Sequence, residues 1–123
     1  MTWTWTAQEI RRTMEKGGVL GKVAALYVAA GYNVVLDYET PAGKLGFLAK
    51  RGKETLAVDV YCNIKQVNEE NMRKLIEKAK QVNGKPILVV YGPIRIPMSL
   101  YDLARRLGVK LKRVKPYSKI KPH

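Results

Sequence analysis

The run of residues 86–91, Pro-Ile-Leu-Val-Val-Tyr, constrains the fold more than any other part of the chain. A strand with one face in water alternates apolar and polar residues, whereas a strand buried on both faces is continuously apolar. The run therefore predicts a central strand covered on both sides. Before it, apolar residues with three-four spacing predict a helix that packs on a sheet, capped by Asn68 and ended by Gly84: Met72, Leu75, Ile76, Ala79 and Val82.

The other face of this helix carries charged residues, which we interpret as solvated helix surface: Arg73, Lys74, Glu77, Lys78 and Lys80. Nearer the start of the chain, residues 6–9 form a capping box, with Trp5 and Ile10 as a hydrophobic staple. This helix is interrupted at residues 17–18 and then resumes as a buried helix that ends at Gly31.

Four further strands and a helix are predicted from β-formers, turn residues and alternation. They are a strand at 32–38 with a turn at 40–43, a hairpin of 44–50 and 54–62 around residues 51–52, a helix from Ser99 to Leu107, and an edge strand at 109–115. Within 54–62, alternation places Leu56, Val58 and Val60 on one face and Ala57, Asp59 and Tyr61 on the other.

These elements predict a single domain over residues 1–115, followed by a basic C-terminal tail at 116–123. A chain of 123 residues is long enough to bury one core. The order of helix, three-stranded meander, helix, strand, helix and strand predicts an α/β fold with a mixed central sheet flanked by helices. The order of the strands in space does not follow from the sequence.

The stretch at 46–61, with Gly17-Gly18-Val-Leu-Gly21 and the helical pattern after it, resembles the core of archaeal Holliday-junction resolvases. These belong to the PD-(D/E)XK, or restriction-endonuclease-like, superfamily. The resemblance covers roughly residues 16–91 and includes the helix at 68–79 that leads into the strand at 86–91. It implies a restriction-endonuclease-like core and, because resolvases work as dimers, a possible homodimer.

The catalytic positions of that family read Gly21, Gly46, Asp59 and Tyr61, where the family carries Glu, Asp, Glu and Lys. Cleavage of a phosphodiester with Mg²⁺ needs converging carboxylates and usually a lysine, and glycine supplies neither. The resemblance thus implies a scaffold without its catalytic residues and without a cofactor.

A divergent nuclease with relocated ligands is the alternative. Asp59 would then hold Mg²⁺ together with Asp37 or Glu39, and Lys65 would replace the missing lysine. Without such a site, Asp59 is a remaining carboxylate that pairs with a nearby lysine.

The charge of the chain favours a polyanionic partner. Twenty-three Lys and Arg stand against 10 Asp and Glu, which gives a net charge of +13, and an excess of this size most often meets phosphate. A highly soluble protein from a hot or salty habitat is the competing interpretation. Predicted nucleic-acid contacts on the former nuclease face are Lys44, Lys50, Arg51, Lys53, Tyr61 and Lys65. A second basic group comprises Arg105, Arg106, Lys110, Lys112, Arg113 and Lys115, followed by Tyr117, Lys119 and Lys121 in the tail.

Other classes of site and location are disfavoured. His123 is the sole histidine and Cys62 the sole cysteine, which argues against His-based triads, an internal disulfide and Cys-based zinc clusters. Residues 16–23 lack the first Gly and the Ser or Thr of a phosphate loop. We predict neither a membrane span nor a signal peptide, and therefore a cytoplasmic protein.

The sequence thus predicts a catalytically inactive, nuclease-like DNA-binding protein. It would recognise the backbone and shape of single-stranded or branched DNA, or stack on exposed bases, with RNA left open. Two rivals remain: the divergent metal-dependent nuclease, and an interaction subunit whose basic surface docks an acidic protein partner.

Overall fold

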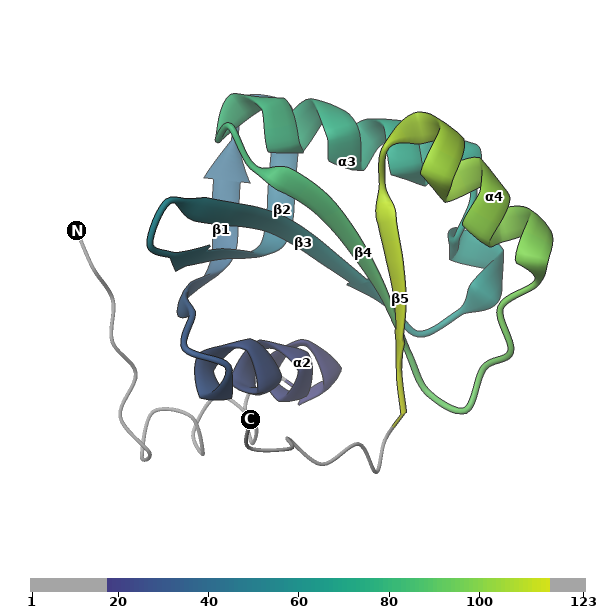
Figure 1. The fold of residues 1–123 in the computed structure, drawn as a ribbon, viewed down its shortest axis with the longest axis horizontal. Helices are drawn as coiled ribbons and strands as arrows, with labels where there is room; N and C mark the ends of the chain where they lie inside the picture. Colours follow the sequence, from purple (N-terminus) through teal and green to yellow (C-terminus); the bar gives the residue numbers. More distant parts are fainter. Residues whose placement is uncertain (1–17, 116–123) are drawn as a thin grey trace.

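The computed structural model describes residues 18–115, and these form one five-stranded sheet with helices on both faces (Figure 1). The predicted capping box, the staple at Trp5 and the basic tail lie outside the described residues. Strands β1 (Asn33–Thr40), β2 (Gly43–Arg51) and β3 (Glu54–Tyr61) form an antiparallel meander. Strands β4 (Lys85–Tyr91) and β5 (Lys110–Val114) continue the sheet parallel to β3, in the order β1-β2-β3-β4-β5. The α/β fold with a mixed sheet is confirmed.

Each face of the sheet is covered by its own helices (Figure 1). Helix α2 (Gly18–Ala29) packs on one face, while α3 (Glu69–Gln81) and α4 (Met98–Leu107) pack on the other; a short 3₁₀ helix, η1 (Ile64–Gln66), links β3 to α3. Side chains of the interior strand β4 enter both cores, Ile87 and Val89 toward α2 and Leu88 and Val90 toward α3 and α4. The prediction of a strand buried on both faces is confirmed.

The end of α2 fixes two tyrosines side by side. Gly31 has a φ of 95°, which lets the amide of Tyr32 donate to the carbonyl of Tyr27 at 3.0 Å. The amide of Gly31 donates to the carbonyl of Val28, also at 3.0 Å. This is a Schellman motif, in which the residue after the left-handed glycine contacts the last turn of the helix. The rings of Tyr27 and Tyr32 accordingly meet edge to face, with centroids 5.6 Å apart.

Two predicted helix ends differ from the structure. Helix α3 ends through Asn83, which takes the left-handed conformation at φ 52°, whereas Gly84 allows close approach to Thr55 and Val82. Asparagine tolerates this conformation because its short polar side chain adds little steric conflict. Helix α4 begins after Pro97 without a side-chain cap, so Ser99 is already inside the helix. The cap at Asn68 is confirmed, since its side chain accepts from the amide of Asn71 at 2.9 Å.

Halfway along β1 and β2, the core side chains switch from the α2 side of the sheet to the α3 side. Leu36 and its cross-strand partner Phe47 pack toward α2, but Tyr38 and its partner Leu45 pack toward α3. Side chains two residues apart in a regular strand share a face. The reversal occurs at Asp37, which has φ of 50°, and at Gly46 opposite it. The backbone pairing of β2 with β3 runs only from Arg51 to Phe47, so the hairpin end at 38–45 turns away from β3 toward α3.

Among residues 18–115, no helix has the length and apolar character that a membrane span requires.

Candidate nucleic-acid interface

The Asp59 carboxylate lies buried where β2 leaves β3. Its Oδ1 accepts the amide of Gly46 at 2.8 Å, and its Oδ2 accepts Nζ of Lys78 at 2.5 Å. Lys78 also donates to the carbonyl of Lys44 at 3.0 Å, so one ammonium from α3 joins β3 to the hairpin end. We call Asp59, Lys78, Gly46 and the Lys44 carbonyl the Asp59 cluster. The pairing of Asp59 with a nearby lysine is confirmed.

Lys78 departs from the sequence prediction. The helix pattern places it on the solvated face, but its side chain is only 12% exposed. The prediction was wrong because the hairpin end at 38–45 folds over this part of α3, as the contact of Lys78 with the Lys44 carbonyl records. The neighbouring Lys74 and Lys80 are exposed and pair with Glu70 and Glu77 within α3, as predicted for solvated surface.

Packing leaves no free space at Gly46, one of the two glycines at positions that the resemblance assigns to catalysis. A Cβ on Gly46 would lie 2.9 Å from the carbonyl oxygen of Val58 and 3.0 Å from Cδ1 of Leu20 on α2. Real side chains do not approach that closely, so a carboxylate at Gly46 requires the backbone or α2 to shift. Gly21 is buried within α2. The carboxylate of Asp59, by contrast, points to the α3 face, so the family's positions do not converge on one open point.

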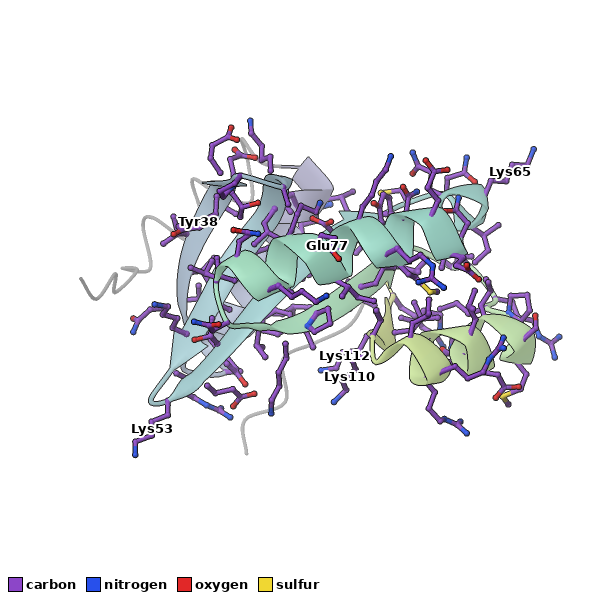
Figure 2. The ribbon with its side chains drawn as sticks, turned by 90° about the horizontal axis from the view of Figure 1, so that it is seen from above. Tyr38, Lys53, Lys65, Glu77, Lys110 and Lys112 are labelled. Carbon is purple, nitrogen blue, oxygen red and sulfur yellow. The ribbon has the colours of Figure 1, made fainter. Side chains whose placement is uncertain are left out.

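The described part of the chain contains no cluster of side chains for the relocated metal site of the nuclease alternative. No group of three or more His, Cys, Asp or Glu side chains within residues 18–115 could hold a metal ion. Glu39 pairs with Lys44 at 3.6 Å on the exposed hairpin, and Asp37 is exposed beside it. Lys65 lies in η1, at the opposite end of the molecule from Tyr38, the neighbour of Asp37 (Figure 2).

The predicted binding residues do not form one continuous face. Lys44 lies near the start of β2 and Arg51 at its end, about 23 Å apart along an extended strand. Lys53, at the tip of the β2–β3 hairpin, lies across the molecule from Lys65 (Figure 2). Lys50 is exposed near this tip.

Tyr61 is half-buried against the core beneath α3 and α4. Burial, and secondarily the charge of Asp59, raises the pKa of its hydroxyl. Its hydroxyl is therefore neutral at physiological pH, and much of its surface is already used in packing. This leaves less of the Tyr61 ring free for base stacking than its prediction as a nucleic-acid contact requires.

The sheet also divides the second basic group. Lys110 and Lys112 point to the α2 face, with Val114 in that core, whereas Leu111 packs on the opposite side. Arg113 shares the face of Leu111, and its guanidinium lies 3.5 Å from the carbonyl of Ile94. Arg105 and Arg106 are exposed in the last turn of α4 on that same side.

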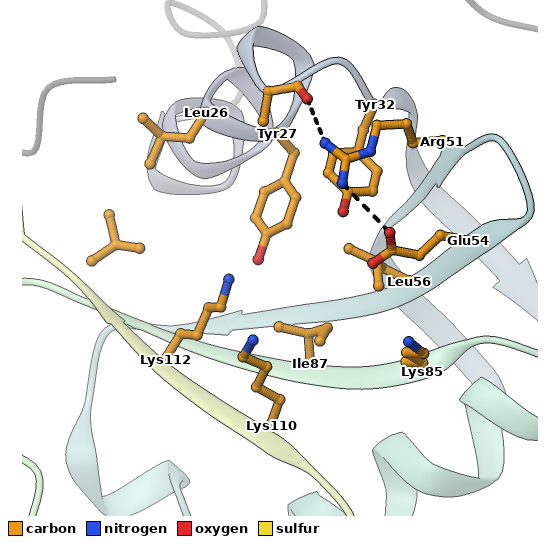
Figure 3. A pocket seen from close by; sticks show the side chains of 12 residues that line it. Leu26, Tyr27, Tyr32, Arg51, Glu54, Leu56, Lys85, Ile87, Lys110 and Lys112 are labelled. Carbon is orange, nitrogen blue, oxygen red and sulfur yellow. Dashed lines mark hydrogen bonds and ion pairs between the residues drawn. The ribbon is translucent and has the colours of Figure 1, made fainter. Parts of the chain in front are cut away.

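The structure gathers basic residues from both predicted groups around a cavity on the α2 face (Figure 3). This α2-face pocket has a volume of about 500 Å³ and lies between the C-terminal end of α2 and strands β3, β4 and β5. Its floor is apolar, formed by the buried side chains of Leu56 and Ile87. Its full lining is Leu26, Tyr27, Ala30, Tyr32, Arg51, Glu54, Leu56, Lys85, Ile87, Lys110, Lys112 and Val114.

One wall of the α2-face pocket is aromatic and held by Arg51. The guanidinium donates to the carbonyl of Ala30 at 2.9 Å, pairs with Glu54 at 3.6 Å and lies 4.4 Å from the ring centroid of Tyr32. Arginine suits this position because its planar fork serves several partners while stacking on a ring. Burial and Glu54 raise the pKa of Tyr32. Arg51 therefore closes the last turn of α2 and has its charge offset by Glu54.

The other wall is lysine-rich. Lys85 begins β4, and Lys110 and Lys112 follow on β5, where the register pairs Lys110 with Ile87. Within residues 18–115, none of the three forms an ion pair with a carboxylate. Burial, followed by the neighbouring charge of Lys110, lowers the pKa of Lys112, and Glu54 partly opposes this. Nζ of Lys112 lies 5.7 Å from the ring centroid of Tyr27.

Sequence reasoning missed Lys85 and the two tyrosines as parts of a site. The Tyr27-x-x-x-Gly31-Tyr32 spacing is a signal for paired rings after a Schellman motif. Alternation along β5 similarly puts Lys110 and Lys112 on one face. The missing information was that β5 lies next to β4, which only the sheet order supplies.

No protein-family model and no curated protein matches the chain. Among solved structures, a crystal structure described as a protein of unknown function, AF1548, superposes with a TM-score of 0.58 at 13% sequence identity. The match covers 75% of this chain and 54% of that one. The chain thus spans about half the length of this structural neighbour, and the similarity shows a shared α/β fold.

Proposed function

We propose that this protein binds nucleic acid through its basic surface without cleaving it, with single-stranded or branched DNA as the favoured partner. The observation that carries the proposal is the α2-face pocket, where three lysines that pair with no carboxylate within residues 18–115 lie around an apolar floor beside two tyrosines. Lysines neutralise phosphates, and apolar and aromatic surface accommodates sugars and bases.

The element order supports a nuclease-like ancestry for this binder. An α2 helix, a three-stranded meander, α3 and a parallel β4 follow one another as the resemblance to the restriction-endonuclease-like superfamily implies. Two features argue against cleavage by this scaffold. Both oxygens of Asp59 are occupied by groups of the chain itself, and Gly46 has no room for a carboxylate.

Binding is tested by fluorescence anisotropy with labelled single-stranded, duplex and four-way DNA across a salt series. For about five phosphate contacts, the logarithm of the affinity should fall against the logarithm of salt with a slope of roughly −3.5 on single strands and −4.5 on duplex. A flat salt response, with tighter binding to an acidic protein than to any DNA, contradicts the proposal and favours the docking subunit.

Absence of cleavage is tested on the same DNAs with Mg²⁺ or Mn²⁺. We expect the substrates to remain intact on sequencing gels. Nicking that a metal chelator abolishes, and that a folded Asp59→Asn variant lacks, would identify the protein as a divergent nuclease.

A further inference from the structure

We infer that the α2-face pocket is a phosphomonoester site, which receives the terminal phosphate and nucleotide of a nucleic-acid strand. The inference rests on the proposed function for the strand, but the pocket chemistry applies equally to a free nucleotide. The site lies at the C-terminal end of α2, near Ala30, whereas the former catalytic position Gly46 contacts Leu20 at the other end of that helix. It is therefore a different place from the Asp59 cluster.

The lysines of the pocket come from adjacent strands and face the same space (Figure 3). Lys110 and Lys112 are two residues apart on β5, which separates their Cα atoms by about 7 Å on one face. The parallel register pairs Lys110 with Ile87, so Lys85 lies diagonally across on β4. Ligand atoms above Ile87 can therefore be approached by ammonium groups from two strands.

The charge of this space matches a dianion better than a single phosphodiester. The lining carries four cations, Arg51 and the three lysines, against the single carboxylate of Glu54, which leaves a balance of three positive charges. A phosphomonoester carries about −1.5 to −2 charges near neutral pH, whereas each phosphodiester carries about −1. Burial, and secondarily the neighbouring charge of Lys110, lowers the pKa of Lys112. A dianion between the two lysines would offset their mutual repulsion.

The hydroxyl of Tyr27 adds a neutral donor. It points into the pocket toward Lys112 (Figure 3) and makes no hydrogen bond to another residue in the described range 18–115. Burial, and secondarily Tyr32, raises the pKa of Tyr27 to about 12, so the hydroxyl keeps its proton at neutral pH. A terminal phosphate has three acceptor oxygens for such a donor and its neighbouring ammonium groups.

The shape of the pocket suits the end of a strand. Its volume of about 500 Å³ is in the range of pockets that enclose a ligand the size of a nucleotide. Leu56 and Ile87, both buried, close it at the sheet, and Tyr32 stands in its wall. The end of a strand can therefore place its terminal nucleotide against this floor, with its phosphate among the lysines.

The test compares three otherwise identical single-stranded oligonucleotides, bearing a 5′-phosphate, a 3′-phosphate or hydroxyls at both ends. We expect at least one of the phosphorylated oligonucleotides to bind roughly tenfold more tightly than the hydroxyl form, because its terminal phosphate gains charged hydrogen bonds in the pocket. Lys110→Ala and Lys112→Ala should remove most of this preference, and Tyr27→Phe part of it. Lys74→Ala, on exposed α3 surface, is the matched control and should retain it.

Two competitors, a nucleoside monophosphate and a short poly-glutamate peptide, distinguish binding of a phosphomonoester from unspecific attraction of negative charge. Competition by the nucleotide but not by the nucleoside supports the site, and competition by poly-glutamate at equal charge overturns it. If all three oligonucleotides bind wild type equally and with a steep salt dependence, the inference fails while nucleic-acid binding stands. If no oligonucleotide binds but the nucleoside monophosphate still does, the proposed function fails while the phosphomonoester site stands.

Discussion

The Asp59 cluster and the α2-face pocket both contain charges beside apolar packing, but they treat those charges in opposite ways. In the Asp59 cluster, a buried carboxylate and a nearly buried ammonium satisfy each other and two backbone groups. In the α2-face pocket, Lys85, Lys110 and Lys112 lack any carboxylate partner among residues 18–115. The Asp59 cluster therefore stabilises the fold, whereas the α2-face pocket leaves its charge available to a ligand.

The largest expected effect is the loss of stability on removing Lys78. Lys78→Ala leaves the carboxylate of Asp59 buried without its cation, and we expect the free energy of unfolding in urea to fall by about 3–5 kcal/mol. Lys74→Ala is the control because Lys74 pairs with Glu70 on exposed surface, and it should change stability by less than about 1 kcal/mol. Equal losses in the two variants would mean that the cluster is not the structural site that we describe.

Alkaline pH should reveal the buried tyrosine of the pocket. The pKa of Tyr27 rises from 10.0 to about 12 in the folded protein, so the stability it contributes is fully present below pH 10 and is lost as pH rises toward 12. We expect a loss of roughly 2–3 kcal/mol over this window. The pKa of Lys112 is lowered instead, so the contribution of Lys112 to stability rises with pH up to about 10.5. Denaturation of wild type and Tyr27→Phe across this range isolates the tyrosine, and identical alkaline losses would contradict its burial.

A methyl group on Gly46 tests how tightly the cluster is closed. Gly46→Ala places Cβ against the Val58 carbonyl and Leu20, and such overpacking should lower stability by about 1–3 kcal/mol. Thermal and urea denaturation measure the loss, and a second substitution, Leu20→Ala, should return part of it through coupling of the two sites. A neutral Gly46→Ala would show that space for a side chain exists, and would reopen the nuclease alternative.

The smallest expected change in stability comes from the pocket lysines. Lys110→Ala should alter the free energy of unfolding by no more than about 0.5 kcal/mol, because Lys110 is exposed and forms no ion pair with another residue of the range 18–115. The salt slope of single-strand binding should nevertheless become shallower by about 0.7, the contribution of one phosphate contact. If Lys110→Ala destabilises the protein as Lys78→Ala does, the contrast between the two regions is wrong.

Local patterns in the sequence predicted most of the fold. Alternation placed Asp59 and Tyr61 on one face, and the apolar run at 86–91 predicted a strand covered on both sides, because these depend only on strand periodicity. Lys78 was assigned to solvent because helix periodicity says nothing about a hairpin that folds over a charged position. Lys85 was missed because its proximity to Lys110 depends on β5 pairing with β4, a contact between distant segments.

The separation of β2 from β3 at Gly46 gives the molecule a region that can open on its own. Beyond this point, the hairpin end is held to the rest of the protein by Tyr38 and Leu45, which pack toward α3, and by the contact of Lys78 with the Lys44 carbonyl. The β2–β3 ladder from Phe47 to Arg51 includes none of these interactions, so we expect it to stay intact when they break. Amide hydrogen exchange at Gly46 then reports a sub-global opening, with a lower free energy than exchange in the interior strand β4.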